Sequence, residues 1–129
     1  MAEKLIKYAD TYEYISVNNK IGTIGISEEA SDKLGDIYLV ELPEIGKEFS
    51  KGEEIAVIES VKTAADAYCP VSGKVIEINL KLESSPELIS KSPLSDGWLF
   101  KIEIRDLSEL DALMDQDEFK KHINEEGRW

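Results

Sequence analysis

Residues 59–66 read Glu-Ser-Val-Lys-Thr-Ala-Ala-Asp and place one lysine, Lys62, between two apolar segments. Residues 54–58 before it are rich in β-branched side chains, and an extended segment begins again at Ala67. The connection between the two segments is long enough only for a tight turn. Such a hairpin displays Lys62 at its tip, in water. Because loops are generally polar and exposed, this feature taken alone is also typical of an ordinary surface lysine.

The composition indicates a small acidic protein. The 129 residues are enough for one domain with a buried core. Acidic residues number 27 against 15 basic ones, which gives a formal net charge of -12. This charge repels phosphate backbones and anionic membrane surfaces, so we expect neither nucleic acid nor a membrane as a partner.

The cysteine count and the N-terminus bear on location. Cys69 is the single cysteine, so no intramolecular disulfide forms, and it lies in an apolar segment as a small buried side chain. Residues 1–8 contain no long apolar run, so we expect neither a signal peptide nor a membrane span. A cytoplasmic location is the simplest expectation.

The rest of the chain predicts a mainly β fold. Ser27 has the chemistry of a helix N-cap, Gly35 can end that helix, and residues 85–89 predict one helical turn capped by Ser85. Short extended segments separated by turn residues favour an antiparallel β-sandwich or flattened barrel with short peripheral helices. The expected strands cover residues 11–17, 21–26, 36–42, 54–58, a segment from 67, 73–79 and 97–104.

The C-terminal region predicts a helix, broken or continuous. Ser108 has the spacing of an N-cap, and Asp115 followed by Glu118 marks a second start. We therefore expect residues 1–129 to form a single domain, with a β-core at about 12–104 and a C-terminal helical segment at 107–125.

The chemistry-bearing residues do not predict an enzyme. A catalytic Cys/His or Ser/His/Asp arrangement would have to use the single histidine, His122, and nothing around it supports one. The chain has too few Cys and His residues for a zinc site, no calcium loop and no phosphate-binding loop, so no metal site is expected. Lys62 remains as the reactive candidate. An exposed lysine is protonated and a poor nucleophile, so another enzyme must acylate it.

Several short motifs around Lys62 resemble lipoyl domains, in which a lysine at a hairpin tip carries lipoic acid in amide linkage. They are Gly46 and residues 49–53, 58–62, 70–73 and 75–79. The flanking segments resemble more specifically the glycine cleavage system H protein family, from about Tyr8 to Trp98. These are residues 22–27, 34–36, 40–43, 85–89 and Gly97-Trp98. The resemblance implies a lipoyl-domain-like antiparallel β-sandwich, also called a barrel-sandwich hybrid or hammerhead.

The resemblance implies a carrier rather than a catalyst. Lipoic acid would be attached to Lys62 by a lipoate ligase or a lipoyl/octanoyl transferase. The arm would take the aminomethyl group of glycine from glycine decarboxylase to aminomethyltransferase, and dihydrolipoyl dehydrogenase would reoxidise it. The residues that form the recognition region around the attachment site would be Glu59, Ser60, Val61 and Asp66.

The resemblance also implies a resting place for the loaded arm. The positions that receive the amine align with Thr11, Glu13 and Asp66. A hydroxyl and two carboxylates suit a protonated amine. Thr11 and Glu13 are also ordinary polar residues for an edge strand, and that interpretation stays open here.

The sequence departs from the family pattern at three places: Tyr12-Glu13-Tyr14, Ser92-Pro93-Leu94 and Cys69. They leave open an alternative, an H-like relay carrier that passes lipoyl groups to 2-oxoacid dehydrogenase complexes. A biotin carrier is disfavoured, because biotin acceptors resemble this hairpin but place methionine where Val61 and Thr63 stand. A purely structural β-sandwich is the remaining alternative.

Overall fold

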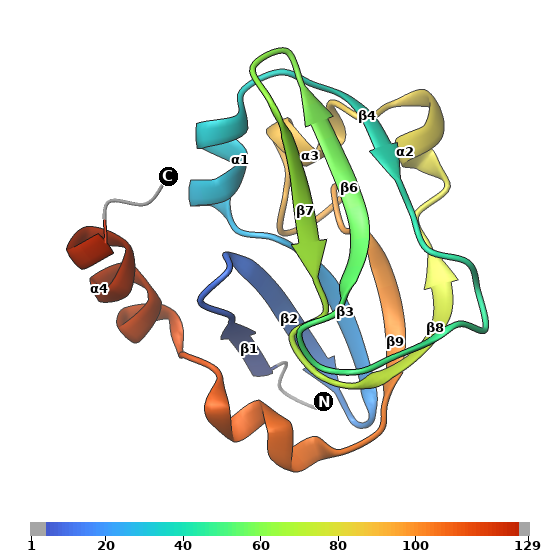
Figure 1. Ribbon diagram of the computed structural model, residues 1–129, viewed down its shortest axis with the longest axis vertical. Helices are drawn as coiled ribbons and strands as arrows, with labels where there is room; N and C mark the ends of the chain where they lie inside the picture. The colour runs from blue at the N-terminus through green and yellow to red at the C-terminus, as the bar shows by residue number, and fades with distance from the viewer. Residues whose placement is uncertain (1–4, 127–129) are drawn as a thin grey trace.

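The computed structural model describes residues 5–126. Both ends of the expected 1–129 domain lie outside the described residues. The expectation of no targeting segment rests partly on residues 1–4, which are among them. Its strands form two antiparallel sheets (Figure 1). The larger sheet has the strand order β1 (Leu5–Tyr8), β2 (Glu13–Asn18), β3 (Ile21–Ile26), β9 (Phe100–Ile104), β8 (Gly73–Ile78) and β5 (Glu48–Phe49). The smaller sheet has the order β4 (Ile37–Glu41), β6 (Glu54–Ser60) and β7 (Ala64–Tyr68).

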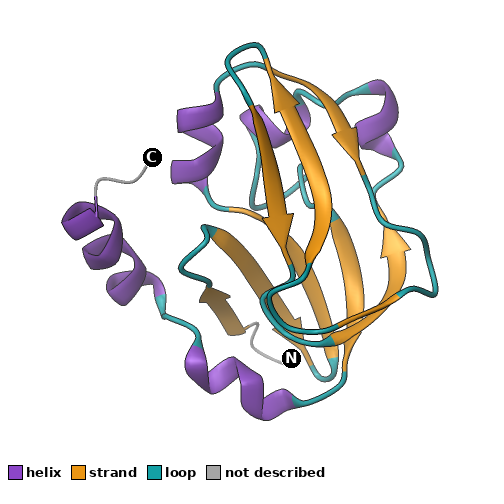
Figure 2. Ribbon diagram, in the orientation of Figure 1, coloured by secondary structure: helices purple, strands orange, loops and turns teal. Residues whose placement is uncertain are grey.

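Short helices surround the sheets (Figure 2). Two of them, α1 and α3, lie at the end of the molecule where the β6–β7 hairpin turns, and α4 lies beside β1 (Figure 1). The helices are α1 (Glu28–Leu34), α2 (Lys81–Ser84), α3 (Leu88–Lys91), the 3-10 helix η1 (Leu107–Ala112) and α4 (Gln116–Glu126).

The core lies between the two sheets. On β2, Ile15 and Val17 face the core and are buried, while Ser16 and Asn18 face outward. Tyr14, also on the outward face, is buried, and its hydroxyl donates to the Pro93 carbonyl at 2.9 Å. The smaller sheet contributes further buried side chains to the same cluster, among them Ile55, Ile58 and Ala67. Burial of each large apolar side chain stabilises the fold by about 1.5–3 kcal/mol. The expectation of a mainly β sandwich with short helices is confirmed.

The caps predicted for the first helix are confirmed. The Ser27 hydroxyl accepts a hydrogen bond from the amide of Ala30 at 3.2 Å. Gly35 has φ +77° and its amide donates to the Ser31 carbonyl at 3.1 Å. Glycine adopts this conformation without the steric penalty that a side chain would bring. These caps fix where α1 ends, beside the β6–β7 hairpin.

The C-terminal segment is helical but broken. The N-cap of η1 is Asp106 rather than Ser108, because the Asp106 carboxylate accepts from the Ser108 amide at 3.0 Å and from its hydroxyl at 2.6 Å. The second start is confirmed, since the Asp115 amide donates to Glu118 at 3.0 Å and the Glu118 amide donates to Asp115 at 2.8 Å.

The order of elements differs from the expectation in several places. Ser85 closes α2 instead of capping residues 85–89, and regular helix begins only at Leu88. Strand β7 begins at Ala64 rather than at residue 67, because alanine has weak β-propensity and pairing with β6 determines the strand. Strands β1 and β5 and helix α2 were not expected. β1 owes its strand geometry to the ladder it forms with β2.

The attachment of α4 gives a prediction about stability. Phe119 is 1% exposed, stacks on Tyr8 with ring centroids 4.5 Å apart and meets the edge of Tyr12 at 5.4 Å. We expect Phe119→Ala to lower the free energy of unfolding by about 3 kcal/mol, measured by urea unfolding. The exposed neighbour Lys120 supplies the control, and Lys120→Ala should change stability by less than about 0.5 kcal/mol. An equal loss of unfolding free energy in both variants would contradict the role of Phe119 in attaching α4.

Candidate functional site: a displayed lysine and a buried carboxyl group

A serine builds the turn at the tip of the β6–β7 hairpin. Val61 and Lys62 occupy its two central positions, and neither has a positive φ. The Ser60 amide donates to the Thr63 carbonyl at 2.8 Å. The Ser60 hydroxyl oxygen accepts from the amides of Lys62 and Thr63, both at 3.2 Å. The side chain of Ser60 thus closes a turn that contains no glycine.

The side chains of the turn are exposed, but its backbone is fixed by hydrogen bonds. Val61 is 69% exposed, and Lys62 and Thr63 are also exposed. The amide of Val61 donates to the carbonyl of Asp36 at 3.0 Å, which ties the tip to the segment after α1. Figure 1 shows the hairpin ending beside this segment. Lys62 is therefore accessible to a partner on a backbone that has a defined position.

The residues expected around the attachment site lie at different depths. Glu59 is half-buried on β6, Ser60 is buried in the turn, and Val61 is exposed at the tip. Asp66 is exposed on β7, opposite Val57. Asp66 follows Lys62 by four positions, which is at most about 13 Å at about 3.3 Å per extended residue. The tip thus includes Glu59, Ser60 and Val61 but not Asp66.

The structure brings Thr11 and Glu13 together and connects them to β7. The Thr11 hydroxyl donates to one oxygen of the Glu13 carboxyl group. The other oxygen accepts from the amide of Tyr68 at 3.0 Å. Asp66 lies two residues before Tyr68 on the same strand, and therefore on the same face. Burial, and then the charges of Asp66, Glu54 and Glu13, raise the pKa of the Tyr68 hydroxyl.

Tyr68 was not among the residues expected from the sequence. A tyrosine on a strand is usually a packing residue, and its spacing carried no signal. The structure identifies Tyr68 as part of the site, because its amide donates to Glu13 and its strand also contains Asp66. Gly35 was likewise expected only as a helix end.

Glu13 is buried without a cation. The residue is 1% exposed, and within residues 5–126 no lysine, arginine or histidine forms an ion pair with it. Burial raises the pKa of Glu13 to about 7, against the hydrogen bonds from Thr11 and Tyr68, which lower it; the charge of Asp10 raises it further. A buried carboxylate without a counterion is costly, so a cation supplied by a ligand would be stabilised here.

A cleft of about 340 Å³ lies beside these residues. Thr11 and Tyr68 line it, and one wall comes from the C-terminal segment, including Leu113, Met114 and His122. The chain beyond the β-core therefore helps to shape the surface next to Glu13.

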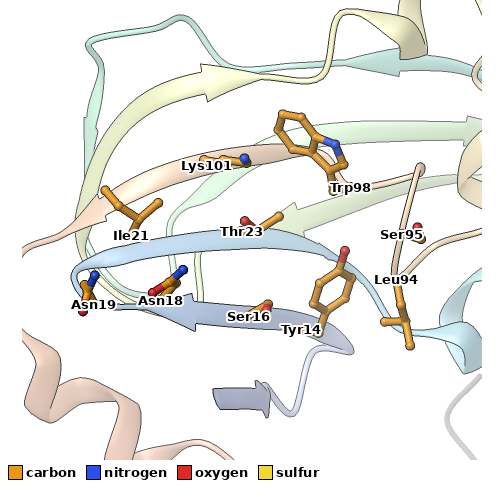
Figure 3. Close-up of a pocket in the computed structure, with 10 residues that line it drawn as sticks. All are labelled: Tyr14, Ser16, Asn18, Asn19, Ile21, Thr23, Leu94, Ser95, Trp98 and Lys101. Carbon is orange, nitrogen blue, oxygen red and sulfur yellow. The ribbon is translucent and has the colours of Figure 1, made fainter. Parts of the chain in front are cut away.

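A second cleft, of about 530 Å³, lies on the outer face of the larger sheet (Figure 3). Its side chains come from β2, β3, β9 and the loop before β9, with Lys101 5.1 Å from the centre of the Trp98 ring. Lys62, Thr11, Glu13 and Asp66 do not line it. Although it is the larger of the two clefts, the chemistry predicted from the sequence lies elsewhere.

The described residues show neither a metal-ligand cluster nor a candidate membrane span. Across residues 5–126, no three or more His, Cys, Asp or Glu side chains are grouped so that they could hold a metal ion. None of the helices described is both long and apolar enough to cross a membrane.

Two antiparallel sheets with a lysine displayed at a tight hairpin turn define a lipoyl-type carrier fold. The sequence model of the family described as "Glycine cleavage H-protein" matches residues 6–126. The chain belongs to this family. It is a lipoyl carrier of glycine cleavage whose cofactor, lipoic acid, is carried on a lysine, and it works with the enzymes of that system.

Individual relatives agree with the family match. The glycine cleavage system H protein of Thermotoga maritima is 49% identical over 123 residues, which cover 95% of this chain and 99% of the relative. That of Symbiobacterium thermophilum is 52% identical over 110 residues, 85% of this chain and 86% of the relative. A crystal structure of a glycine cleavage system H protein from Mycobacterium marinum is similar with a TM-score of 0.83 and 28% identity, covering 95% and 96% of the two chains.

The pKa of Glu13 gives a prediction about pH. Because burial raises this pKa from 4.5 to about 7, the unfolded chain releases the proton at lower pH than the folded chain. Glu13 therefore lowers stability as the pH rises from 4.5 to about 7, by about 3 kcal/mol in total, and has no further effect above that. Between pH 4.5 and 8, the Glu13→Gln variant should therefore gain about 3 kcal/mol of unfolding free energy relative to the wild type.

Denaturant unfolding at a series of pH values measures this difference. Glu83, which is exposed on α2, supplies the control, and the difference for Glu83→Gln should stay within about 0.5 kcal/mol throughout. A flat difference for Glu13→Gln would contradict the raised pKa.

Proposed function

We propose that Lys62 is the lysine that carries the lipoyl group, in amide linkage through Nζ. The observation that supports this most directly is the turn itself. Ser60 and Asp36 fix its backbone with hydrogen bonds, while the lysine stays exposed. Because the tip projects beside α1, a partner can approach the lysine without displacing a strand (Figure 1). When bound, the lipoyl group would supply the disulfide and thiol chemistry for accepting and delivering an aminomethyl group.

We propose that the enzyme that attaches the group recognises the tip through Glu59, Ser60 and Val61, with Asp66 further along β7. Glu59 offers charge and Val61 apolar contact, since both reach the surface. Ser60 acts through the shape of the turn because its side chain is buried. The enzyme is a lipoate ligase or a lipoyl/octanoyl transferase.

We propose that Thr11, Glu13 and Asp66 receive the loaded arm. A lysine side chain extended by a lipoyl group reaches on the order of 14 Å from the backbone by ordinary bond lengths. Asp66, at most about 13 Å from Lys62 along the chain, is within this reach, and Glu13 lies further along the same path. The support is electrostatic: two carboxyl groups, one of them buried without a cation, favour a protonated amine.

We propose further that the chain is a carrier subunit without catalysis of its own. Its thiol supports this, since burial raises the pKa of Cys69 to about 12 and its Sγ donates to the Val71 carbonyl at 2.8 Å, so it is a weak nucleophile. The partners would be glycine decarboxylase, aminomethyltransferase and dihydrolipoyl dehydrogenase. The acidic surface favours partners with positive docking sites.

We propose that the whole chain, 1–129, acts as one carrier domain, because one buried cluster includes residues from Tyr8 to Phe119. The expected division into a β-core at about 12–104 and a helical segment at 107–125 stays a prediction. So does the cytoplasmic location, which fractionation of the source cells tests.

The attachment residue is tested by intact-mass analysis. We expect one lipoyl adduct on the wild-type protein and none on Lys62→Arg, because a guanidinium keeps the charge but is not acylated. Lys74 is also exposed, on β8, and Lys74→Arg should keep the adduct. With glycine decarboxylase, only the adduct-bearing proteins should support glycine-dependent release of carbon dioxide.

Two outcomes would contradict the proposal. An adduct mapped to another lysine would exclude Lys62 as the attachment residue. An adduct on Lys62 that accepts no aminomethyl group would instead favour the alternative, a relay carrier that passes lipoyl groups to 2-oxoacid dehydrogenase complexes.

The resting place is tested by the lifetime of the loaded arm. Asp66→Asn removes a charge-assisted contact that contributes about 1.5–3 kcal/mol, so spontaneous loss of the aminomethyl group should accelerate by at least about tenfold. Mass spectrometry of the loaded protein over time measures this rate. The exposed Asp32 on α1 supplies the control, and Asp32→Asn should leave the rate unchanged. Equal rates in all three proteins would contradict the assignment of Asp66.

A further inference from the structure

Three segments that are distant in the sequence line the cleft of about 340 Å³ beside Thr11. Lys51 comes from the turn before β6, Pro70 from the chain after β7, and Ala112 from the end of η1. Because these segments share the cleft, its shape depends on what holds them together.

One serine connects the three segments. Ser72, two residues after Pro70, is 8% exposed, and its hydroxyl oxygen accepts from the amide of Lys51 at 2.9 Å. Its amide donates to Oε1 of Glu109 on η1 at 2.7 Å, and its hydroxyl donates to Oε2 at 3.1 Å. Its carbonyl accepts from the amide of Arg105, just before η1, at 3.0 Å. Each polar group of Ser72 thus binds one of the other two segments.

Glu109 is the side chain that ties η1 to this serine. It is half-buried, and within residues 5–126 no lysine, arginine or histidine forms an ion pair with it. Hydrogen bonds to a charged acceptor are roughly twice as strong as neutral ones. The next residue, Leu110, is buried, but apolar packing is non-directional. The two contacts of the carboxylate therefore set the position of η1.

The far end of this cleft wall is also fixed. Met114 forms a bridge with Tyr8, in which the amide of each residue donates to the carbonyl of the other at 2.8 Å. Ala112 and Leu113, which line the cleft, lie between this bridge and Glu109. The contact of Glu109 with Ser72 thus determines where the wall begins.

We propose that Glu109 is a positioning residue for the loaded arm: by binding Ser72, it holds the C-terminal wall of the cleft at a fixed distance from the two other segments. This rests on the proposed resting place of the arm beside Thr11, Glu13 and Asp66. A displaced wall would admit water to the aminomethyl group. Loss of that group is a hydrolysis that consumes one water: the carbon–sulfur bond breaks, its electron pair stays on sulfur, and a thiol, formaldehyde and ammonium result.

Three variants of the lipoylated full chain, loaded by glycine decarboxylase with glycine, test this role. Glu109→Ala removes both contacts with Ser72. Glu109→Gln keeps both, because the side-chain oxygen accepts from the Ser72 amide and the NH₂ group donates to its hydroxyl oxygen. Asp106→Ala is the matched control. The exposed Asp106 carboxylate also accepts from the amide and hydroxyl of a serine, Ser108, but this contact stays within the C-terminal segment.

Mass spectrometry over time gives the rate of aminomethyl loss, and urea unfolding compares the stabilities. We expect Glu109→Ala to lose the group on the order of fivefold faster than the wild type. Glu109→Gln and Asp106→Ala should stay within about twofold of the wild type. Equal rates in the wild type and Glu109→Ala, or an equal acceleration in either of the other variants, would overturn the proposal.

A second variant covers the case in which Glu109→Ala does not fold. Ser72→Ala removes only the hydroxyl that joins Lys51 to Glu109, and we expect loss on the order of threefold faster; an unchanged rate would overturn the proposal. In the unmodified wild-type chain, the Ser72 amide should exchange its hydrogen at least about tenfold more slowly than an unprotected amide. Exchange at the unprotected rate would also overturn the proposal.

Asp66→Asn separates this proposal from the resting place on which it rests. If Asp66→Asn accelerates the loss and Glu109→Ala does not, only the role of Glu109 fails. If neither variant accelerates it, the resting place itself fails.

Discussion

The hydrogen bond from the Val61 amide to the Asp36 carbonyl joins the displayed turn to the end of α1. β6 pairs with β4 as far as Ser60, which lies opposite Ile37, so this hydrogen bond extends that pairing by one residue into the turn. Here the tip is held by Ser60 from within and by Asp36 from outside. A carrier must expose its lysine to several enzymes, so the lysine side chain cannot be fixed in place by burial. The backbone supplies the rigidity, and the side chain stays exposed.

At Glu13 the functional group is buried instead of exposed. The Glu13 carboxyl group is 1% exposed and forms no ion pair with any of residues 5–126, so it lowers stability at neutral pH. Two hydrogen bonds, from Thr11 and Tyr68, keep it in place without removing that cost. In the proposed resting place, a protonated amine brought by the arm would act as the missing counterion, and the unloaded arm would bring none.

The sequence predicted these two regions unequally. The hairpin was predictable because its signals are local: β-branched residues before the turn, a short connection and one lysine. The caps at Ser27, Gly35 and Asp115 were predictable for the same reason. The surroundings of Glu13 were not, since its contact with Tyr68 spans 55 positions in the chain and depends on how two sheets pack. Strand β1 likewise depends on pairing with β2. The proximity of Lys62 to Gly35 depends on tertiary packing.

Local preference and tertiary structure disagree at Glu13, whose buried carboxyl group forms no ion pair with any of residues 5–126. Gly35 is no such conflict, because glycine adopts its φ of +77° without a steric penalty. Natural sequences keep such conflicts mainly where function requires them. Glu13 begins β2 and meets β7 at the amide of Tyr68, two residues beyond Asp66. The proposed acylation of Lys62 would replace its ammonium by a neutral amide, which would change the formal net charge from -12 by one unit to -13. Under the proposed assignments, positive charge would return to the side chain only when it is loaded with an amine, for which Asp66 on β7 and Glu13 on β2 would be the complementary partners.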